Sequence, residues 1–134
     1  MSESWIVVPG VVVLPLSEGV SVTVKAQLAS GEERRMIRRG VSYGADGART
    51  FDPVEAGVAK ILAYLVDWTV PGPDGRVVPI AGLAPEGLEP VLDMLGSDRY
   101  TEILRAVEAH EARQAEARAA KKKTPSGELT SSAT

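Results

Sequence analysis

Residues 20–28, Val-Ser-Val-Thr-Val-Lys-Ala-Gln-Leu, alternate apolar and polar side chains, and this pattern indicates that the chain begins with a β-sheet. Successive side chains of a strand point to opposite faces, so the apolar set would cover a core while the polar set faces water. Residues 29–32, Ala-Ser-Gly-Glu, have the composition of a turn. We therefore predict that Glu33–Arg39 returns as the second strand of a hairpin.

The residues before this hairpin also favour strands. Trp5–Val8 and Val11–Leu16 are rich in β-branched residues, and Pro9-Gly10 separates them. Proline has no backbone N–H to donate, so such a segment is typical of a bent or edge strand. Together these segments predict three or four antiparallel strands over about residues 5–41, and a connecting loop is expected over residues 41–50.

A helix is predicted next, because Asp52 can cap it, Pro53 suits the first helical position and Glu55 suits the third. From Val54 to Trp68 the apolar residues recur at spacings of three and four. This spacing gathers them on one stripe that must be buried. The sequence therefore predicts a helix over about residues 53–68.

Two further helices complete the predicted α+β domain. Apolar residues at helical spacing predict a short helix over about residues 89–95 and a longer one over about residues 98–120. Residues 121–134 consist mostly of Lys, Ser, Thr, Gly and Pro, and we expect a disordered tail there. Residues 1–50 would form the β-rich part, and residues 51–120 the helical part, of one domain.

The composition excludes several kinds of chemistry. The 134 residues include no Cys and one His, so they supply no thiolate nucleophile, iron–sulfur cluster or multi-histidine metal site, and we expect no cofactor. Fifteen basic residues stand against 18 acidic ones. Non-specific binding of duplex nucleic acid needs a positive excess, so this balance argues against such a partner. The apolar runs are too short and too interrupted to span a membrane.

Few side chains suggest catalysis. His110 has no second His or Cys to work with, and we predict a histidine on the surface of a helix. Glu108 and Glu111 lie one turn apart, but basic residues alternate with them as on a solvated helix face. Trp68 is predicted to anchor the core where its helix meets a loop. We therefore predict a protein that is not an enzyme.

Arg34, Arg35, Arg38 and Arg39 form the sharpest local charge feature. On the predicted strand these four side chains divide between two faces and form no continuous patch. Their simplest role is to protect an edge strand, because charge on an edge resists pairing with other chains. A binding patch for an acidic partner is the alternative.

A series of short motifs follows in a distinctive order. They are Glu33–Arg39, Val41-Ser42-Tyr43-Gly44, Tyr64-Leu65-Val66-Asp67-Trp68, Asp74-Gly75-Arg76 with Val78-Pro79-Ile80, and Tyr100-Thr101-Glu102-Ile103-Leu104 leading to His110-Glu111. Over roughly residues 20–115 this order resembles small tail proteins of long-tailed, siphovirus-like bacteriophages, especially their tail assembly chaperones.

The resemblance implies a chaperone made during infection, in the host cytoplasm. Such chaperones coat the aggregation-prone tape measure protein and help tail-tube subunits polymerise around it, so these two proteins would be the partners. A homo-oligomer is also compatible with this family. A ribosomal frameshift near the end of the gene is frequent among them, and Lys121-Lys122-Lys123 is compatible with an adenine-rich slippery run.

Reversible coating is the mechanism that we expect. The tape measure should be a long helix with apolar seams, and a groove between the helix at residues 54–68 and the helix at residues 100–107 would cover them. Many copies on one template would gain by effective concentration. The residues predicted to contact a partner are Val58, Ile61, Leu65, Trp68, Tyr100, Leu104, Arg34, Arg35, Arg38 and Arg39.

Two other functions remain open at this level. A virion component of the tail-completion or head–tail joining type would use the β-rich part to build a ring. A nucleic-acid-binding regulator would use the four arginines, but the balanced charge and the lack of a helix-turn-helix pattern or an aromatic stacking platform argue against it.

Overall fold

The computed structural model describes residues 5–133, with side chains up to Lys121, and has the predicted α+β architecture. Three antiparallel strands form a sheet in the order β1-β2-β5. They are β1 (Val11–Pro15), β2 (Ser21–Lys25) and β5 (Leu65–Trp68). The predicted strands at Val11–Leu16 and Val20–Leu28 are confirmed over Val11–Pro15 and Ser21–Lys25, whereas Trp5–Val8, predicted as a strand, lies outside the sheet.

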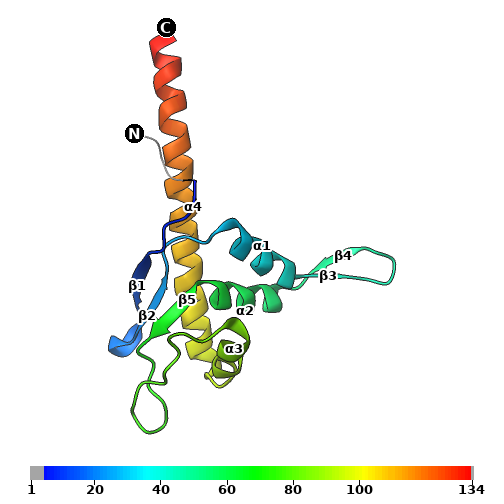
Figure 1. The fold of residues 1–134 in the computed structure, drawn as a ribbon, viewed down its shortest axis with the longest axis vertical. Helices are drawn as coiled ribbons and strands as arrows, with labels where there is room; N and C mark the ends of the chain where they lie inside the picture. Colours follow the sequence, from blue (N-terminus) through cyan, green and yellow to red (C-terminus); the bar gives the residue numbers. More distant parts are fainter. Residues whose placement is uncertain (1–4, 134) are drawn as a thin grey trace.

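A short 3₁₀ turn, η1 (Ser17–Gly19), joins β1 to β2. A second, two-stranded sheet is a separate hairpin of β3 (Val41–Tyr43) and β4 (Arg49–Phe51). We call residues 41–51 the arm, because this hairpin projects away from the rest of the molecule (Figure 1). The expected loop over residues 41–50 is therefore largely a hairpin, and its turn follows Gly44.

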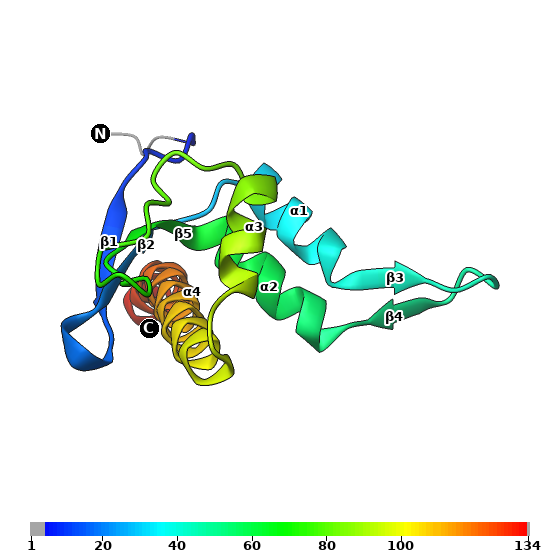
Figure 2. The ribbon, with the colours of Figure 1, turned by 90° about the horizontal axis from the view of Figure 1, so that it is seen from below.

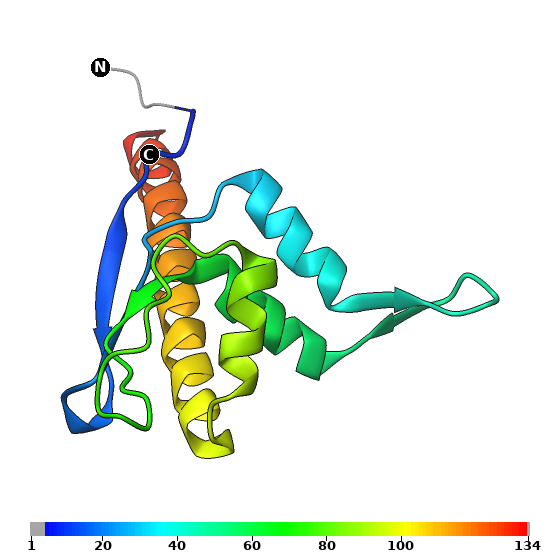
Figure 3. The same ribbon diagram turned by 60° about the horizontal axis from the view of Figure 1, so that its bottom comes forward.

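Four helices accompany the two sheets, one more than the sequence predicts. They are α1 (Ser30–Arg39), α2 (Pro53–Tyr64), α3 (Pro85–Asp93) and α4 (Ser97–Ala133). Seen from below, α4 lies with β1 on one side and with α2 and α3 on the other (Figure 2). The arm leaves the body where α1 ends and α2 begins (Figure 3).

One core joins the three-stranded sheet to the helices. Trp68 lies in it as predicted, although on a strand, and its indole N–H donates to the Val78 carbonyl at 2.8 Å. The other members of this core come from both halves of the sequence. They are Leu14, Val22, Val24, Leu28, Ile61, Leu62, Tyr64, Leu65, Ile80, Leu88, Leu92, Ile103 and Val107.

The return strand predicted for Glu33–Arg39 is wrong, because these residues belong to α1. The Glu32 carboxylate accepts a hydrogen bond from the Ala29 N–H at 2.9 Å and so satisfies a free donor at the helix start. Acidic residues lie in the first turn and Arg38 and Arg39 in the last, which complements the helix dipole. The signals of a helix start were present in a stretch that resembles a turn.

The predicted helix over residues 53–68 begins correctly but is too long. Asp52 caps α2 as expected, since its carboxylate accepts from the N–H groups of Val54 and Glu55 at 3.0 and 3.2 Å. The helix ends at Tyr64, and the next four residues pair with β2 as strand β5. Apolar residues that fit a helical stripe also bury themselves from a strand, so periodicity alone could not place this boundary.

The last two helices differ from prediction at their ends. Helix α3 begins at Pro85 rather than near Glu89, because proline is well tolerated in a first turn, and it ends at Asp93. Helix α4 begins one residue before the predicted start, and its path continues through residues 121–133. A disordered tail is expected for that stretch; the side chains from residue 122 onward lie outside the described residues, and that expectation stays a prediction.

Candidate polypeptide-binding surface

The root of the arm is set by a close contact between α1 and α2. Gly40 is buried, and a Cβ built on it would lie 2.9 Å from the Cβ of Ala56. Only a residue without a side chain allows the two helices to approach this closely. The Asp52 N–H donates to the Gly40 carbonyl at 2.8 Å, which joins the two ends of the arm.

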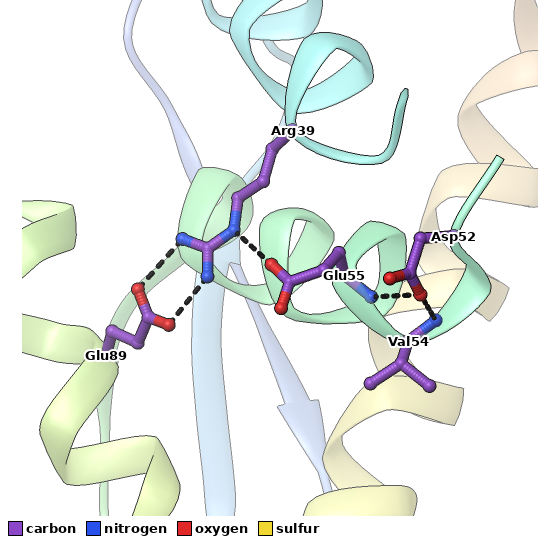
Figure 4. Close-up of polar contacts among 5 residues, drawn as sticks. All are labelled: Arg39, Asp52, Val54, Glu55 and Glu89. Carbon is purple, nitrogen blue, oxygen red and sulfur yellow. Dashed lines mark hydrogen bonds and ion pairs between the residues drawn. The ribbon is translucent and has the colours of Figure 1, made fainter. Parts of the chain in front are cut away.

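Arg39 clamps this root to the body. Its guanidinium donates two hydrogen bonds to the Glu89 carboxylate, at 2.8 and 2.6 Å, and one to Glu55 at 3.1 Å (Figure 4). These bonds raise the pKa of Arg39 above its ordinary value, and the bonds from Arg39 lower the pKa of Glu89. One arginine thus connects α1, α2 and α3, so the arm projects from a fixed base.

One face of the arm carries three apolar side chains, those of Val41, Tyr43 and Phe51, beside Arg49. In its register Val41 pairs with Phe51 and Tyr43 with Arg49, whereas Ser42 pairs with Thr50. Because strand residues alternate between faces, the first two pairs share one side and the third lies on the other. Tyr43 and Phe51 are 69% and 66% exposed, so two aromatic rings face water on the projecting hairpin, with Phe51 next to its root.

Three of the four arginines lie on the outer surface of α1. Arg34, Arg35 and Arg38 are exposed, and none of them makes an ion pair or a side-chain hydrogen bond in the described part of the chain. On a helix Arg34 and Arg38 share a face and Arg35 borders it, so the three do form a continuous patch. The prediction that they protect an edge strand is wrong, and Arg39 has the different role described above.

The apolar residues predicted to contact a partner lie mainly in the core. Ile61, Leu65 and Trp68 are buried, and Val58, Tyr100 and Leu104 are half-buried. Helices α2 and α4 pack directly on each other, since a Cβ on Gly57 would lie 3.1 Å from a methyl group of Leu104. The expected groove between these helices is therefore filled by their own side chains.

His110 is buried, not on the surface as predicted. Its side chain is 2% exposed, its Nε2 lies 2.9 Å from the Lys25 carbonyl oxygen, and its ring meets the edge of Tyr64 with centroids 5.6 Å apart. The histidine ties α4 to β2 and extends the apolar stripe of α4 by one turn past Val107. Its spacing of three from Val107 was the signal that could have placed it.

Glu108 and Glu111 are not purely solvated, because both pair with Lys60 of α2, at 3.8 and 2.9 Å. Among the described side chains, up to Lys121, no group of three or more potential ligands could hold a metal ion. No described helix is long and apolar enough to cross a membrane. The arm and the outer face of α1 thus combine exposed aromatic rings with arginines that form no ion pair in the described part of the chain.

A cleft of about 430 Å³ lies between η1, the loop after β5 and the start of α4. Its walls are mainly apolar, and Arg99 stands at its rim. That guanidinium already pairs with Glu18 at 2.7 Å and with Glu102 at 3.3 Å. These three charged side chains of the cleft are therefore already paired with one another, and together they carry one negative charge.

The chain matches no family model, and neither curated proteins nor solved structures include a significant match.

Proposed function

We propose that this protein is a non-catalytic tail assembly chaperone of a long-tailed bacteriophage, which binds the tape measure protein and promotes assembly of the tail tube around it. The observation that carries the proposal is the arm, with the aromatic rings of Tyr43 and Phe51 exposed on one face. A two-stranded hairpin is marginally stable alone, and exposed aromatic side chains are typical of protein-binding surfaces.

The chemistry of this surface suits a long amphipathic helix. Tyr43 and Phe51 offer apolar area to a seam of the tape measure, and the exposed Arg34 and Arg38 offer charge to acidic residues that flank the seam. Each contact is small, so a single copy would bind weakly. Many copies along one template would bind well together, because each bound copy raises the effective concentration of the next.

Helix α4 supplies a second property that a coating protein needs. From Ala115 to Lys121 every side chain is exposed, and the stretch consists of Ala, Glu, Arg and Lys. Such a helix stays hydrated when the arm is occupied. A template covered by many copies would therefore remain in solution.

The proposal is tested by co-expressing the chain with the tape measure protein of the same phage genome. We expect the tape measure protein to become soluble and to co-elute with the chain in size-exclusion chromatography. The double variant Tyr43→Ser/Phe51→Ser should lose both effects. The matched control is Ser42→Ala/Thr50→Ser, which changes the opposite face of the same hairpin and should keep them. No association of the wild-type chain, or equal association of both variants, would contradict the proposal.

Substitution of the arginines provides a second, independent test of the same proposal. Arg34→Glu/Arg38→Glu should weaken co-elution, and raising the salt concentration should weaken the wild-type complex in the same direction. Arg76→Glu, which changes an exposed arginine of the loop after β5, should have no effect.

A permanent place in the virion is the competing function. Mass spectrometry of purified particles separates the two, since a chaperone should be absent or scarce in them. A ring subunit would appear at a fixed copy number, and that result would replace the chaperone proposal.

A further inference from the structure

The free edge of β1 carries an inference that does not depend on the proposed function. The inner edge is used by β2: the Ala26 N–H donates to the Gly10 carbonyl at 2.9 Å, and the Leu16 N–H donates to Val20 at 2.7 Å. Hydrogen-bonded pairs alternate along an antiparallel ladder, so the even-numbered residues of β1 bond to β2. The N–H and C=O groups of Val11 and Val13 therefore point outward, where no strand of the described chain lies.

This edge is apolar as well as open. Residues 5–16 contain no charged side chain, and Val11 and Val13 are 58% and 60% exposed. Charged residues on an edge strand usually prevent pairing with other chains, and here they are missing. The edge strand is thus suited to accept another strand.

Two prolines limit how far such pairing can extend. Pro15 alternates with Val11 and Val13 along β1, so the N–H that it lacks is one of the free edge. Pro9 continues this alternation two residues before Val11, next to Gly10, whose carbonyl still bonds to the Ala26 N–H. The edge consequently offers two donors, Val11 and Val13, between two positions that cannot donate. A strand that pairs with this edge can accept hydrogen bonds from only these two N–H groups, so the paired segment must be very short.

The chain itself has the matching edge, because this pattern is symmetric about Val12. Prolines lie three residues to either side of Val12, and outward-facing valines lie one residue to either side. A two-fold axis at Val12 places Val11 of one copy opposite Val13 of the second copy, and Val13 of the first opposite Val11 of the second. Each of these two pairs exchanges two N–H···O=C bonds, which makes four in all. Pro9 then faces Pro15 of the second copy, so no N–H is left without an acceptor.

We propose that two copies of this chain associate through antiparallel β1–β1 pairing about Val12, which joins their sheets into one of six strands. The pair would carry two arms, one from each copy. The strand that pairs with this edge is thus β1 of a second copy of the chain. The register, the prolines and the apolar side chains of the free edge are all self-complementary.

Cysteine cross-linking tests the register directly, because the chain has no Cys of its own. Residues of a hydrogen-bonded antiparallel pair have Cα atoms about 5.5 Å apart, within reach of a disulfide. We expect an equimolar mixture of Val11→Cys and Val13→Cys to form a covalent heterodimer on mild oxidation. Each variant alone should cross-link much less, because identical positions are offset by two residues. No cross-link in the mixture, or equal cross-linking in all three samples, would overturn the proposal.

Analytical ultracentrifugation provides the second readout. The wild-type chain should show a concentration-dependent dimer, and Val13→Pro, which removes an outward N–H, should be a monomer with an unchanged circular dichroism spectrum. Val13→Glu should also be a monomer, whereas the control Val54→Glu, at a 72% exposed site on α2, should still dimerise. A wild-type monomer at all concentrations, or a dimer that survives both Val13 changes, would overturn the proposal. If Val13→Pro fails to fold, Val13→Glu and the cysteine mixture decide.

Discussion

The body and the arm of this molecule differ in how far their apolar side chains are buried. The body encloses a core of apolar side chains, and in the described chain no buried side-chain nitrogen or oxygen lacks a hydrogen-bond partner. In the arm, residues 42–51 are all exposed, including two aromatic rings. The comparison teaches that stability comes from the core of the body, whereas the arm adds exposed aromatic surface and little stability. Substitutions should therefore separate the two properties.

The largest expected effect comes from the centre of the body. Trp68→Ala removes a side chain that is 3% exposed and also leaves the Val78 carbonyl without its donor. We expect the free energy of unfolding to fall by about 3–5 kcal/mol, measured by urea denaturation. A loss below about 1 kcal/mol would mean that Trp68 does not anchor the core.

A smaller effect is expected at the junction of the two regions. Gly40→Ala places a Cβ 2.9 Å from the Cβ of Ala56, which forces α1 and α2 apart. This overpacking should cost about 1–3 kcal/mol in urea denaturation. The control Gly47→Asn lies at the tip of the arm, where φ is 80° and no atom is close, and should change stability less. If both substitutions cost the same, the helix contact does not set the root of the arm.

The ion pairs of Arg39 should make a modest, pH-dependent contribution. Because Arg39 donates to Glu89, the pKa of Glu89 lies below its ordinary 4.5 in the folded protein. An unfolded chain binds a proton to this carboxyl more readily, so the stabilisation is present above pH 4.5 and is lost as the pH falls through the folded pKa. Thermal melts should show Glu89→Gln losing less stability on acidification than wild type. A control, Glu86→Gln, should keep the wild-type slope.

The smallest effect on stability is expected from the arm. Tyr43→Ser/Phe51→Ser changes two exposed side chains and should alter the free energy of unfolding by no more than about 0.5 kcal/mol per site. The same double variant should lose association with the tape measure protein. A large loss of stability in urea denaturation would show instead that the two rings belong to the folded core.

Much of the body could be predicted from the sequence, because its signals are local. The alternation in residues 20–28 identifies β2, and the cap at Asp52 identifies the start of α2. Where local signals compete, prediction failed. The apolar spacing through Leu65 to Trp68 fits a helix and a strand equally well, and pairing with β2, a contact between distant residues, decides for the strand.

The arm and the arginine patch could not be predicted for the same reason. If Glu33–Arg39 is assigned to a strand, its arginines divide between two faces. On helix α1, in contrast, three of them lie together, and Arg39 forms an ion pair with Glu89. Tyr43 and Phe51 belong to no periodic pattern, so only the register of the hairpin places them on one face. A lone histidine on a polar stretch suggests a surface, whereas the packing of α4 against β2 buries His110.

Hydrogen–deuterium exchange of the wild-type chain, alone and in the proposed complex with the tape measure protein, tests the central claim most directly. In the free protein the amides of residues 41–51 should exchange faster than those of β2 and α2, because the arm has no cover. In the complex, these arm amides should become protected while those of the core change little. Formation of a complex in which the arm exchanges as fast as before would contradict the account.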